Sequence, residues 1–337
     1  MAQADAWVER LILAALHQQR FAEALEWAAH ARAFLGRGAR DALVEGRLEA
    51  GVGVALLGLG DRDGALAAER RALALDESEL GPNHITLTRS LTAQGNILRT
   101  LGRYDEALAA HRRSMKIREA LLDDTHPGLA ISYNGLGRVL LAMGKVDEAI
   151  EEHEKAKRLL FGGDLSASPL ESAKTLAMLG EALRAKGDHA RALAEWSDAL
   201  ERVSPLLTPS HPMRATLQRD VARAAIATGD PTRAATAFGA AVEGAWPVAE
   251  KTALTLEWAQ TLLRTRAWKP AIDALGALEG AEAHWVRAQA WRELKDPAKS
   301  TREAQAAIQA FTAQADEARA AEVQSWLKPA KVTRRKR

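Results

Sequence analysis

The stretch Gly102-Arg-Tyr-Asp-Glu-Ala107 recurs in altered form along the chain, as Gly144-Lys-Val-Asp-Glu-Ala149, Gly187-Asp-His-Ala-Arg-Ala192 and Gly229-Asp-Pro-Thr-Arg-Ala234. The four glycines are 42, 43 and 42 residues apart, and the 337-residue chain is almost eight such periods long. Self-similarity at a fixed period of this size indicates a stacked repeat array rather than two separate globules. We therefore expect eight helical hairpins, with turns near residues 19, 60, 102, 144, 187, 229, 266 and 295.

Two further columns of the repeat carry small side chains. Seven residues before each turn stand Gly53, Gly95, Gly137, Gly180, Ala222, Ala259 and Ala288, with Ile12 as the exception in the first repeat. Five residues after the turn stand Ala24, Ala65, Ala107, Ala149, Ala192, Ala234 and Ala271. Small side chains at these offsets allow two antiparallel helices to pack closely, and each hairpin then buries its apolar face on its neighbours. The pattern predicts an all-α fold.

A further column, twelve residues after the turn, holds Ala31, Ala72, Ser114, Ala156, Ala199, Ala241, Leu278 and Ala307. These columns resemble the tetratricopeptide repeat (TPR), whose signature is a small residue, a turn glycine and two alanines at the same offsets. The 42-residue period, together with Gly81-Pro-Asn-His84, Thr125-His126-Pro127 and Ser210-His211-Pro212, is similar to the kinesin-light-chain type of this repeat. The chain also resembles the TPR regions that follow the catalytic domain of many bacterial Ser/Thr protein kinases. The resemblance implies a right-handed superhelical TPR solenoid of about eight helical hairpins over residues 1–327.

The last ten residues, 328–337, depart from the repeat. They carry six basic side chains and no acidic one, so we expect a basic, disordered tail. Without these six charges the formal net charge of +2 becomes −4 for residues 1–327. The sequence therefore predicts a mildly acidic folded body.

Composition and the chain's first residues exclude several classes of protein. The absence of cysteine removes disulfide scaffolds, thiolate metal sites and cysteine nucleophiles. The N-terminus lacks a basic segment followed by an apolar one, and no run of about 18 apolar residues occurs anywhere. We expect a cytoplasmic protein without a membrane partner.

Sequence motifs for catalysis are missing. The chain contains no Gly-rich loop, Val-Ala-Ile-Lys strand, His-Arg-Asp or Asp-Phe-Gly motif of a protein kinase, and no phosphate-binding loop or nucleophile elbow. Glycine pairs such as Gly51-Val-Gly53 lie inside predicted helices, where small size is the simpler explanation. We expect a non-enzymatic protein that needs no cofactor.

The nine histidines raise the question of a metal site. His84, His126 and His211 share one column, and a capping residue followed by proline is typical of a helix start. His111 and His153 share a core column and are predicted to fill space between helices. Zinc needs several convergent ligands at about 2 Å, whereas residues one repeat apart are spread along the array. The sequence predicts no metal site.

Four tryptophans gather where the repeat becomes irregular. They are Trp258, Trp268, Trp285 and Trp291. Two interpretations remain open: the rings compensate for lost small-residue contacts by packing, or they line a ligand pocket.

The TPR resemblance implies that the first helix of each hairpin lines an inner groove through positions 13, 10, 6, 3 and 2 before the turn. Applied to repeats two to seven, this rule selects a surface on which Glu181 is the one acidic residue. The candidate binding residues are Arg47, Arg89, Asn96, Arg99, Asn134, Arg138, Lys174, Arg184, Arg219, Arg223 and Arg264. We expect Arg99, Arg138, Lys174 and Arg184 to form one continuous solvent-facing strip. The alternative is that these arginines only solvate an exposed helix face.

The leading hypothesis is a protein–protein interaction scaffold or regulatory module that holds an acidic or phosphorylated segment, because clustered arginines favour carboxylate and phosphate groups. The kinase resemblance places it in bacterial Ser/Thr-kinase signalling, with a Ser/Thr kinase or its substrate as partner. One alternative is a peptide- or metabolite-sensing TPR regulator. Single-stranded nucleic-acid binding is a weaker alternative, since the overall charge is small and basic and aromatic residues do not alternate.

Overall fold

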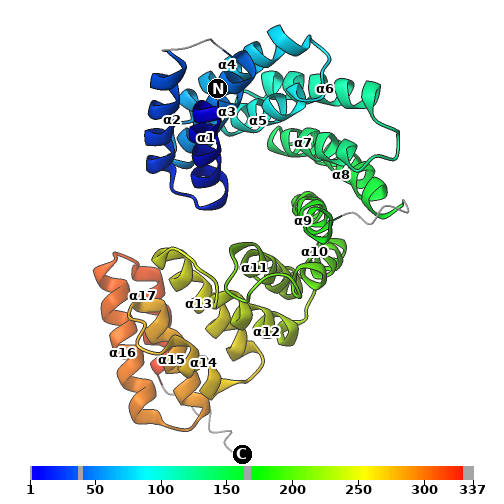
Figure 1. The fold of residues 1–337 in the computed structure, drawn as a ribbon. Coiled ribbons are helices and arrows are strands. Elements are labelled where there is room, and N and C mark those ends of the chain that lie inside the picture. Colours follow the sequence, from blue (N-terminus) through cyan, green and yellow to red (C-terminus); the bar gives the residue numbers. More distant parts are fainter. Residues whose placement is uncertain (1, 37–40, 163–167, 329–337) are drawn as a thin grey trace, which may run out of the picture. The chain divides into compact units, whose positions relative to one another are not determined.

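The computed structural model describes residues 2–36, 41–162 and 168–328. Every regular element in these ranges is a helix, and the chain divides into two compact units, the N-terminal unit at residues 1–186 and the C-terminal unit at residues 187–337 (Figure 1). An all-α fold is therefore confirmed. The sequence predicts a single array over residues 1–327, and its continuity across the unit boundary stays a prediction. The predicted tail, apart from Lys328, lies outside the described residues.

The N-terminal unit pairs consecutive helices through short turns. The pairs α1–α2, α3–α4, α5–α6 and α7–α8 each pack together, and each second helix also contacts the first helix of the next pair. The helices are α1 (Ala2–Ile12), η1 (Leu13–His17), α2 (Phe21–Leu35), α3 (Ala42–Gly58), α4 (Arg62–Leu80), α5 (Leu87–Thr100), α6 (Tyr104–Leu121), α7 (Gly128–Ala142), α8 (Val146–Phe161) and α9 (Pro169–Lys186).

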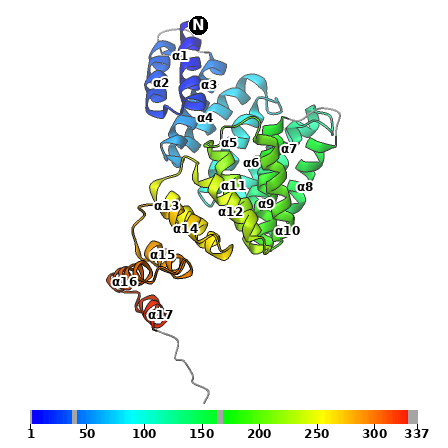
Figure 2. The same ribbon diagram turned by 90° about the horizontal axis from the view of Figure 1, so that it is seen from below.

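The C-terminal unit repeats this arrangement in the pairs α11–α12, α13–α14 and α15–α16. Figure 2 shows α15 and α16 side by side, with α17 beside α16 at the end of the unit. Helix α17 follows the eighth predicted hairpin and lies within residues 1–327, which the sequence assigns to the solenoid. The helices are α10 (His189–Val203), α11 (Pro212–Ala227), α12 (Pro231–Val242), α13 (Val248–Arg264), α14 (Trp268–Leu275), α15 (Ala281–Glu293), α16 (Pro297–Ala313) and α17 (Glu317–Leu327).

Each predicted turn contains one residue with positive φ. Glycine occupies this place in the regular repeats, where Gly102 has φ 73° and Gly144 has φ 76°. Because a residue without Cβ adopts this conformation at no steric cost, glycine ends the first helix of a hairpin cleanly. Outside the regular repeats the same conformation falls on Gln19, Arg266 and Lys295, with φ between 54° and 59°. The turn geometry therefore persists where the glycine has been lost.

Second helices of several hairpins begin at an aspartate cap. The carboxylate of Asp61 accepts a hydrogen bond from the Gly64 backbone N–H (2.9 Å), and Asp230 does the same for Arg233 (2.9 Å). Such caps satisfy backbone donors that the helix itself leaves unpaired. The helix start thus follows the turn residue within two positions.

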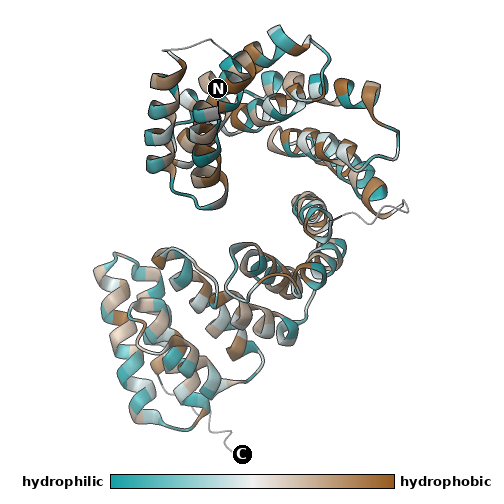
Figure 3. Ribbon diagram, viewed as in Figure 1, coloured by the Kyte–Doolittle hydropathy of each residue, from teal (hydrophilic) through white to brown (hydrophobic). Residues whose placement is uncertain are grey.

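The core of the regular repeats is built around one column of the second helices. Glu69, His111, His153, Trp196 and Phe238 occupy it, and all are at most 2% exposed. The small column of the first helices faces it. Hydrophilic and hydrophobic residues mix along each helix (Figure 3), and the buried column itself includes Glu69, His111 and His153, so it is not uniformly apolar.

The first hairpin is irregular because its first helix changes winding. After α1 the chain forms the π-helical turn η1, with a hydrogen bond from the Gln18 N–H to the Leu13 carbonyl oxygen (3.2 Å). A π turn accommodates one extra residue per turn.

Candidate functional site

Three of the predicted groove cations in the N-terminal unit are ion-paired. Arg47 on α3 pairs with Asp5 (Nη1–Oδ1, 3.4 Å) and Glu9 of α1, and Lys174 on α9 pairs with Glu171 (2.6 Å). Arg89 on α5 lies 3.9 Å from Oδ2 of the buried Asp76. These carboxylates lie outside the groove positions that the sequence rule selects, so the rule overstates the free positive charge.

Arg99 on α5 and Arg138 on α7 form the centre of the remaining charge. Neither makes an ion pair with a carboxylate within the part of the chain that the structure describes. The Nε of Arg99 is buried without an acceptor, and Nη1 of Arg138 donates to Oδ1 of Asn96 (3.4 Å). Burial lowers the pKa of Arg138, the charge of Arg99 lowers it further, and Glu181 acts in the opposite direction.

The expected solvent-facing strip is only partly correct. Arg184 on α9 is exposed, whereas Arg99 and Arg138 are half-buried. Both lie close enough to the buried His111 for their charges to lower its pKa, and that ring fills the space beside Gly95 and Gly135. Arg99 and Arg138 are therefore partly covered by packed protein.

His111 is enclosed by glycine and arginine. A Cβ on Gly95 would lie 2.5 Å from Nε2 of the ring, and a Cβ on Gly135 would lie 2.5 Å from Nδ1. Both ring nitrogens lack a hydrogen-bond partner. Burial, and then the charges of Arg138, Arg118 and Arg99, lower the pKa of His111 to about 4. The ring is therefore neutral at pH 7 and adds no charge to the groove.

Arg118 is a buried cation that the sequence analysis missed, because it lies on α6 outside the inner-face columns. It is 7% exposed and donates to the hydroxyl oxygens of Ser114 (2.8 Å) and Ser132 (2.7 Å). Burial lowers its pKa. Its partners are neutral hydroxyl groups, so its charge adds to that of Arg99 and Arg138. Ser114 and Ser132, two polar residues at buried positions, are the sequence signal that could have indicated a buried polar partner here.

The two groove asparagines are engaged within the protein. Asn134 lies between the buried His153 (Oδ1 to Nδ1, 2.9 Å) and Thr175, to whose Oγ1 it donates (2.7 Å). Asn96 accepts from Arg138. In this structure both side chains connect neighbouring helices.

In the C-terminal unit the predicted cations divide in the same way. Arg223 on α11 makes a two-bond pair with Glu257 of α13 (2.7 and 3.0 Å). Arg219 contacts Asp220 (2.9 Å) and stacks on Trp246. Arg264, at the end of α13, has no carboxylate within 4 Å among the described residues and faces a pocket.

This pocket has a volume of about 460 Å³ and is lined by residues of α13, α15 and α17 together with Trp268, the first residue of α14. On α15 it takes in the residues 13, 10, 6, 3 and 2 positions before the turn at Lys295, which is the eighth hairpin that the sequence rule left out. Its lining residues are Gln260, Leu263, Arg264, Trp268, Glu282, Trp285, Val286, Gln289, Arg292, Glu293, Arg319 and Trp326. Of the sequence-predicted site residues, only Arg264 belongs to it.

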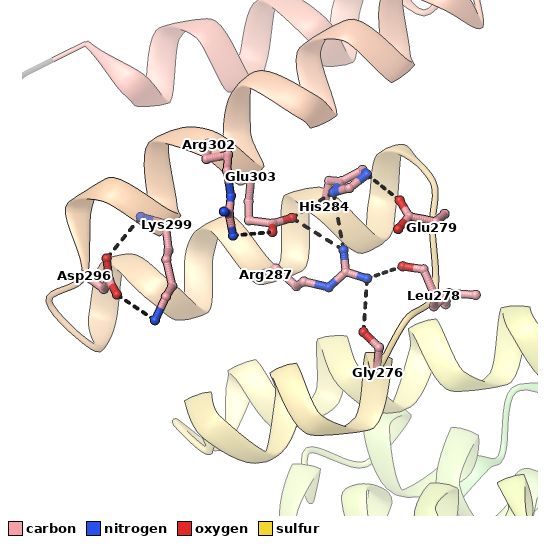
Figure 4. A network of polar contacts seen from close by, with 9 residues as sticks. All are labelled: Gly276, Leu278, Glu279, His284, Arg287, Asp296, Lys299, Arg302 and Glu303. Atoms are coloured by element: carbon pink, nitrogen blue, oxygen red, sulfur yellow. Dashed lines mark hydrogen bonds and ion pairs between the residues drawn. The ribbon is translucent and has the colours of Figure 1, made fainter.

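A polar network holds α15 in place (Figure 4). Arg287, which is 7% exposed, donates to the carbonyl oxygens of Leu278 and Gly276 (3.5 Å) in the turn before α15, and lies 3.4 Å from Glu303 of α16. His284 lies between Glu303 (2.7 Å) and Glu279 (3.0 Å). The network fixes the helix where α14 is only eight residues long.

The histidines of the capping column behave as the sequence predicts. Nδ1 of His126 accepts from the Gly128 N–H (2.9 Å), and Nδ1 of His211 accepts from the Met213 N–H (3.2 Å) at the start of α11. No group of three or more metal-ligating side chains occurs within the described ranges. None of the described helices is long and apolar enough to cross a membrane.

Paired helices with a positive-φ turn, a facing small column and polar inner faces define a helical-repeat protein of the interaction type. The tetratricopeptide repeat family model matches residues 44–120, 86–160 and 171–245, which together exceed half of the chain. The chain belongs to the tetratricopeptide repeat family. None of the curated proteins matches the sequence significantly.

RapI and NprR show the same fold as this chain. The apo form of RapI is similar with a TM-score of 0.60 at 9% identity, over 96% of this chain and 96% of that one. The apo form of the quorum sensor NprR from B. thuringiensis has a TM-score of 0.60 at 11% identity, over 90% and 87%. A Podosopora anserina putative kinesin light chain, with nearly identical TPR-like repeats, has a TM-score of 0.48 at 21% identity, over 58% and 92%. At these identities the likeness concerns the fold alone.

Proposed function

We propose that this TPR protein is a non-enzymatic interaction module that binds an acidic or phosphorylated segment of a protein partner through the N-terminal unit. The anchor is the group of Arg99, Arg138 and the exposed Arg184, on α5, α7 and α9. A Ser/Thr kinase or its substrate in bacterial signalling is the partner we favour, on the strength of the sequence resemblance.

The observation that carries this proposal is the unpaired state of Arg99 and Arg138. Arg47, Arg89 and Lys174 of the same inner face make ion pairs with carboxylates, whereas Arg99 and Arg138 make none among the described side chains. Half-buried guanidinium groups hold anions more strongly than fully hydrated ones, because less water screens the interaction. An acidic segment supplies the missing carboxylate or phosphate oxygens.

The test uses three fluorescent octapeptides, one of glutamates, one with a central phosphoserine and one neutral. Wild-type protein is expected to bind the first two. The double variant Arg99→Gln/Arg138→Gln should bind them at least tenfold more weakly, equal to about 1.4 kcal/mol. Glutamine is preferred to glutamate here, because these positions are half-buried and a carboxylate would introduce a new buried charge.

The matched control is Arg112→Gln/Arg158→Gln, which removes two exposed arginines from second helices. It should leave affinity unchanged, with circular dichroism confirming that both proteins are folded. Equal binding by the two double variants would show that Arg99 and Arg138 only solvate the helix face. Affinity capture with the same pair of proteins then identifies native partners.

The alternatives from the sequence predict other results. A peptide- or metabolite-sensing regulator changes solution shape on binding a small ligand, and NprR is a quorum sensor on the same fold. Single-stranded nucleic-acid binding requires affinity for random oligonucleotides that falls steeply with salt.

A further inference from the structure

We infer that the pocket on α13, α15 and α17 binds a short peptide of about three residues with both termini free and an aromatic C-terminal side chain. This site is independent of the basic group in the N-terminal unit. The two sites have in common only that their charged residues lie on first helices of hairpins.

Two opposite charges in the pocket are available to a ligand. Arg264 and Glu293 both stand two residues before a turn, on α13 and α15 respectively, and these helices contact each other. Neither side chain makes an ion pair within 4 Å in the described part of the chain. A ligand with a carboxylate and an ammonium group is the chemical complement of such a pair.

The other charges of the pocket are already used. Arg319 of α17 makes two bonds to Glu282 (2.7 and 3.0 Å) and one to Glu322 (2.7 Å). Arg292 lies over the Trp326 ring at 3.6 Å and donates to the Trp326 carbonyl oxygen (2.9 Å). Arg292 is thus held in one place beside Glu293, while Arg264 and Glu293 remain to bind the termini.

The spacing of the helices sets the length of the ligand. Packed helices have axes about 8–10 Å apart, and an extended chain advances about 3.3–3.6 Å per residue. Residues in the same column of α13 and α15 are therefore bridged by roughly three residues. A volume of about 460 Å³ lies within the range of small-ligand pockets.

The middle of the pocket fits a peptide backbone and a flat side chain. Gln260 and Gln289 share a second column, and each side-chain amide offers both donors and an acceptor. Trp268 and Trp285 form an aromatic wall of the pocket. The Trp285 ring packs edge-on against the Trp326 ring, with the ring centroids 4.8 Å apart. Aromatic rings pack against these walls in offset or edge-to-face geometry.

The pocket is also held rigid before any ligand arrives. The bonds from Arg287 to the carbonyl oxygens before α15, and its contact with Glu303 of α16, fix the position of this helix. A preformed site loses less entropy on binding.

The test uses a pool of tripeptides with two randomised residues followed by phenylalanine, detected by native mass spectrometry of the full-length protein. Three forms of the pool are compared: free termini, C-terminal amide and N-terminal acetyl. The free pool should bind, and each blocked pool should bind at least tenfold more weakly. No binding of the free pool, or equal binding of all three, overturns the inference. Phenylalanine alone, run as a fourth arm, should not bind, since a single residue cannot bridge the two helices.

Variants then locate the charges. Arg264→Gln should weaken binding of the free pool at least tenfold and leave binding of the amide pool unchanged. Glu293→Gln should likewise weaken binding of the free pool at least tenfold and leave binding of the acetyl pool unchanged. Lys251→Gln removes an exposed cation from the same helix, α13, and is the matched control that should change nothing. An effect of Lys251→Gln equal to that of Arg264→Gln contradicts the inference. Because Arg99→Gln/Arg138→Gln leaves this pocket intact, failure of the acidic-octapeptide proposal is distinguishable from failure of this one.

Discussion

His111 and His153 are uncharged histidines at the centre of the N-terminal unit, with no exposed surface. Burial is the first cause that lowers the pKa of each to about 4, and the neighbouring arginine charges add to it. A buried ring without an acid partner has no compensation when it takes up a proton. The acid stability of the fold should therefore depend on these two residues.

We predict that the protein loses stability as the pH falls from 6.5 to 4. The histidines take up protons near 6.5 in the unfolded chain and only near 4 in the fold, so the stabilisation is complete above pH 6.5 and is lost towards pH 4. A shift of this size corresponds to about 3 kcal/mol per histidine. Urea unfolding across this range checks it, and His111→Gln/His153→Gln should flatten the curve. An unchanged slope in that variant would contradict the assignment.

Glu69 has the opposite pH dependence in the same core column. Burial raises its pKa to about 7, against the effects of Arg89 and Ser90. Its contribution is favourable below pH 4.5 and is lost as the pH rises through 7, because the unfolded chain ionises first. We predict that Glu69→Gln gains about 2–3 kcal/mol more stability at pH 8 than at pH 5. Equal effects at both pH values, measured by urea unfolding, would show that Glu69 is already ionised in the fold.

At the scale of the element, the hairpin turn is the part of the repeat with the most constrained backbone conformation. Arg266 and Lys295 adopt φ 59° there, a conformation that costs a residue with a Cβ about 1–2 kcal/mol. Glycine avoids this cost but has more freedom to lose on folding.

Arg266→Gly and Lys295→Gly should each stabilise the protein by up to about 1 kcal/mol. The change replaces an exposed side chain and leaves the turn hydrogen bonds intact. Differential scanning calorimetry measures the gain, and Gly102→Ala, the reverse change in a regular turn, should be destabilising. If the glycine variants melt lower than wild type, the long side chains stabilise the turn in another way.

At the scale of the whole molecule, two pairs of histidines occupy helix caps and the core. His84 and His126 direct Nδ1 at backbone N–H groups, and His111 and His153 are enclosed. We predict that zinc, nickel or cobalt at modest excess leaves the Tm unchanged. A saturable rise in a thermal-shift assay that His126→Ala abolishes would reveal a site that these positions do not suggest.

The fold could be predicted because the repeat period is marked by glycines, and backbone geometry requires glycine at these positions. The turn glycines mark positive φ, and the glycines facing His111 and His153 mark contacts with no room for a Cβ. The candidate site could be predicted only in part. Sequence columns place Arg47, Arg89 and Lys174 on inner faces, but their carboxylate partners lie at positions to which the rule was not applied, including Glu9, ten residues before the first turn. The pocket of the C-terminal unit was missed because the repeat becomes shorter there. The position of α15 depends on the contacts of the buried Arg287, which no sequence column indicates.

The π turn at Leu13–His17 shows how a helix can contain an additional residue without losing its packing. An inserted residue in a tightly stacked helix would rotate every later side chain by about 100° if the winding stayed α-helical. Here one wider turn takes up the difference, and Leu11, Ala14 and Ala15 all remain buried. A wider turn at this place therefore lets a first helix of a different length keep its apolar face on the core, whereas the interior hairpins have only α-helical winding among the described residues.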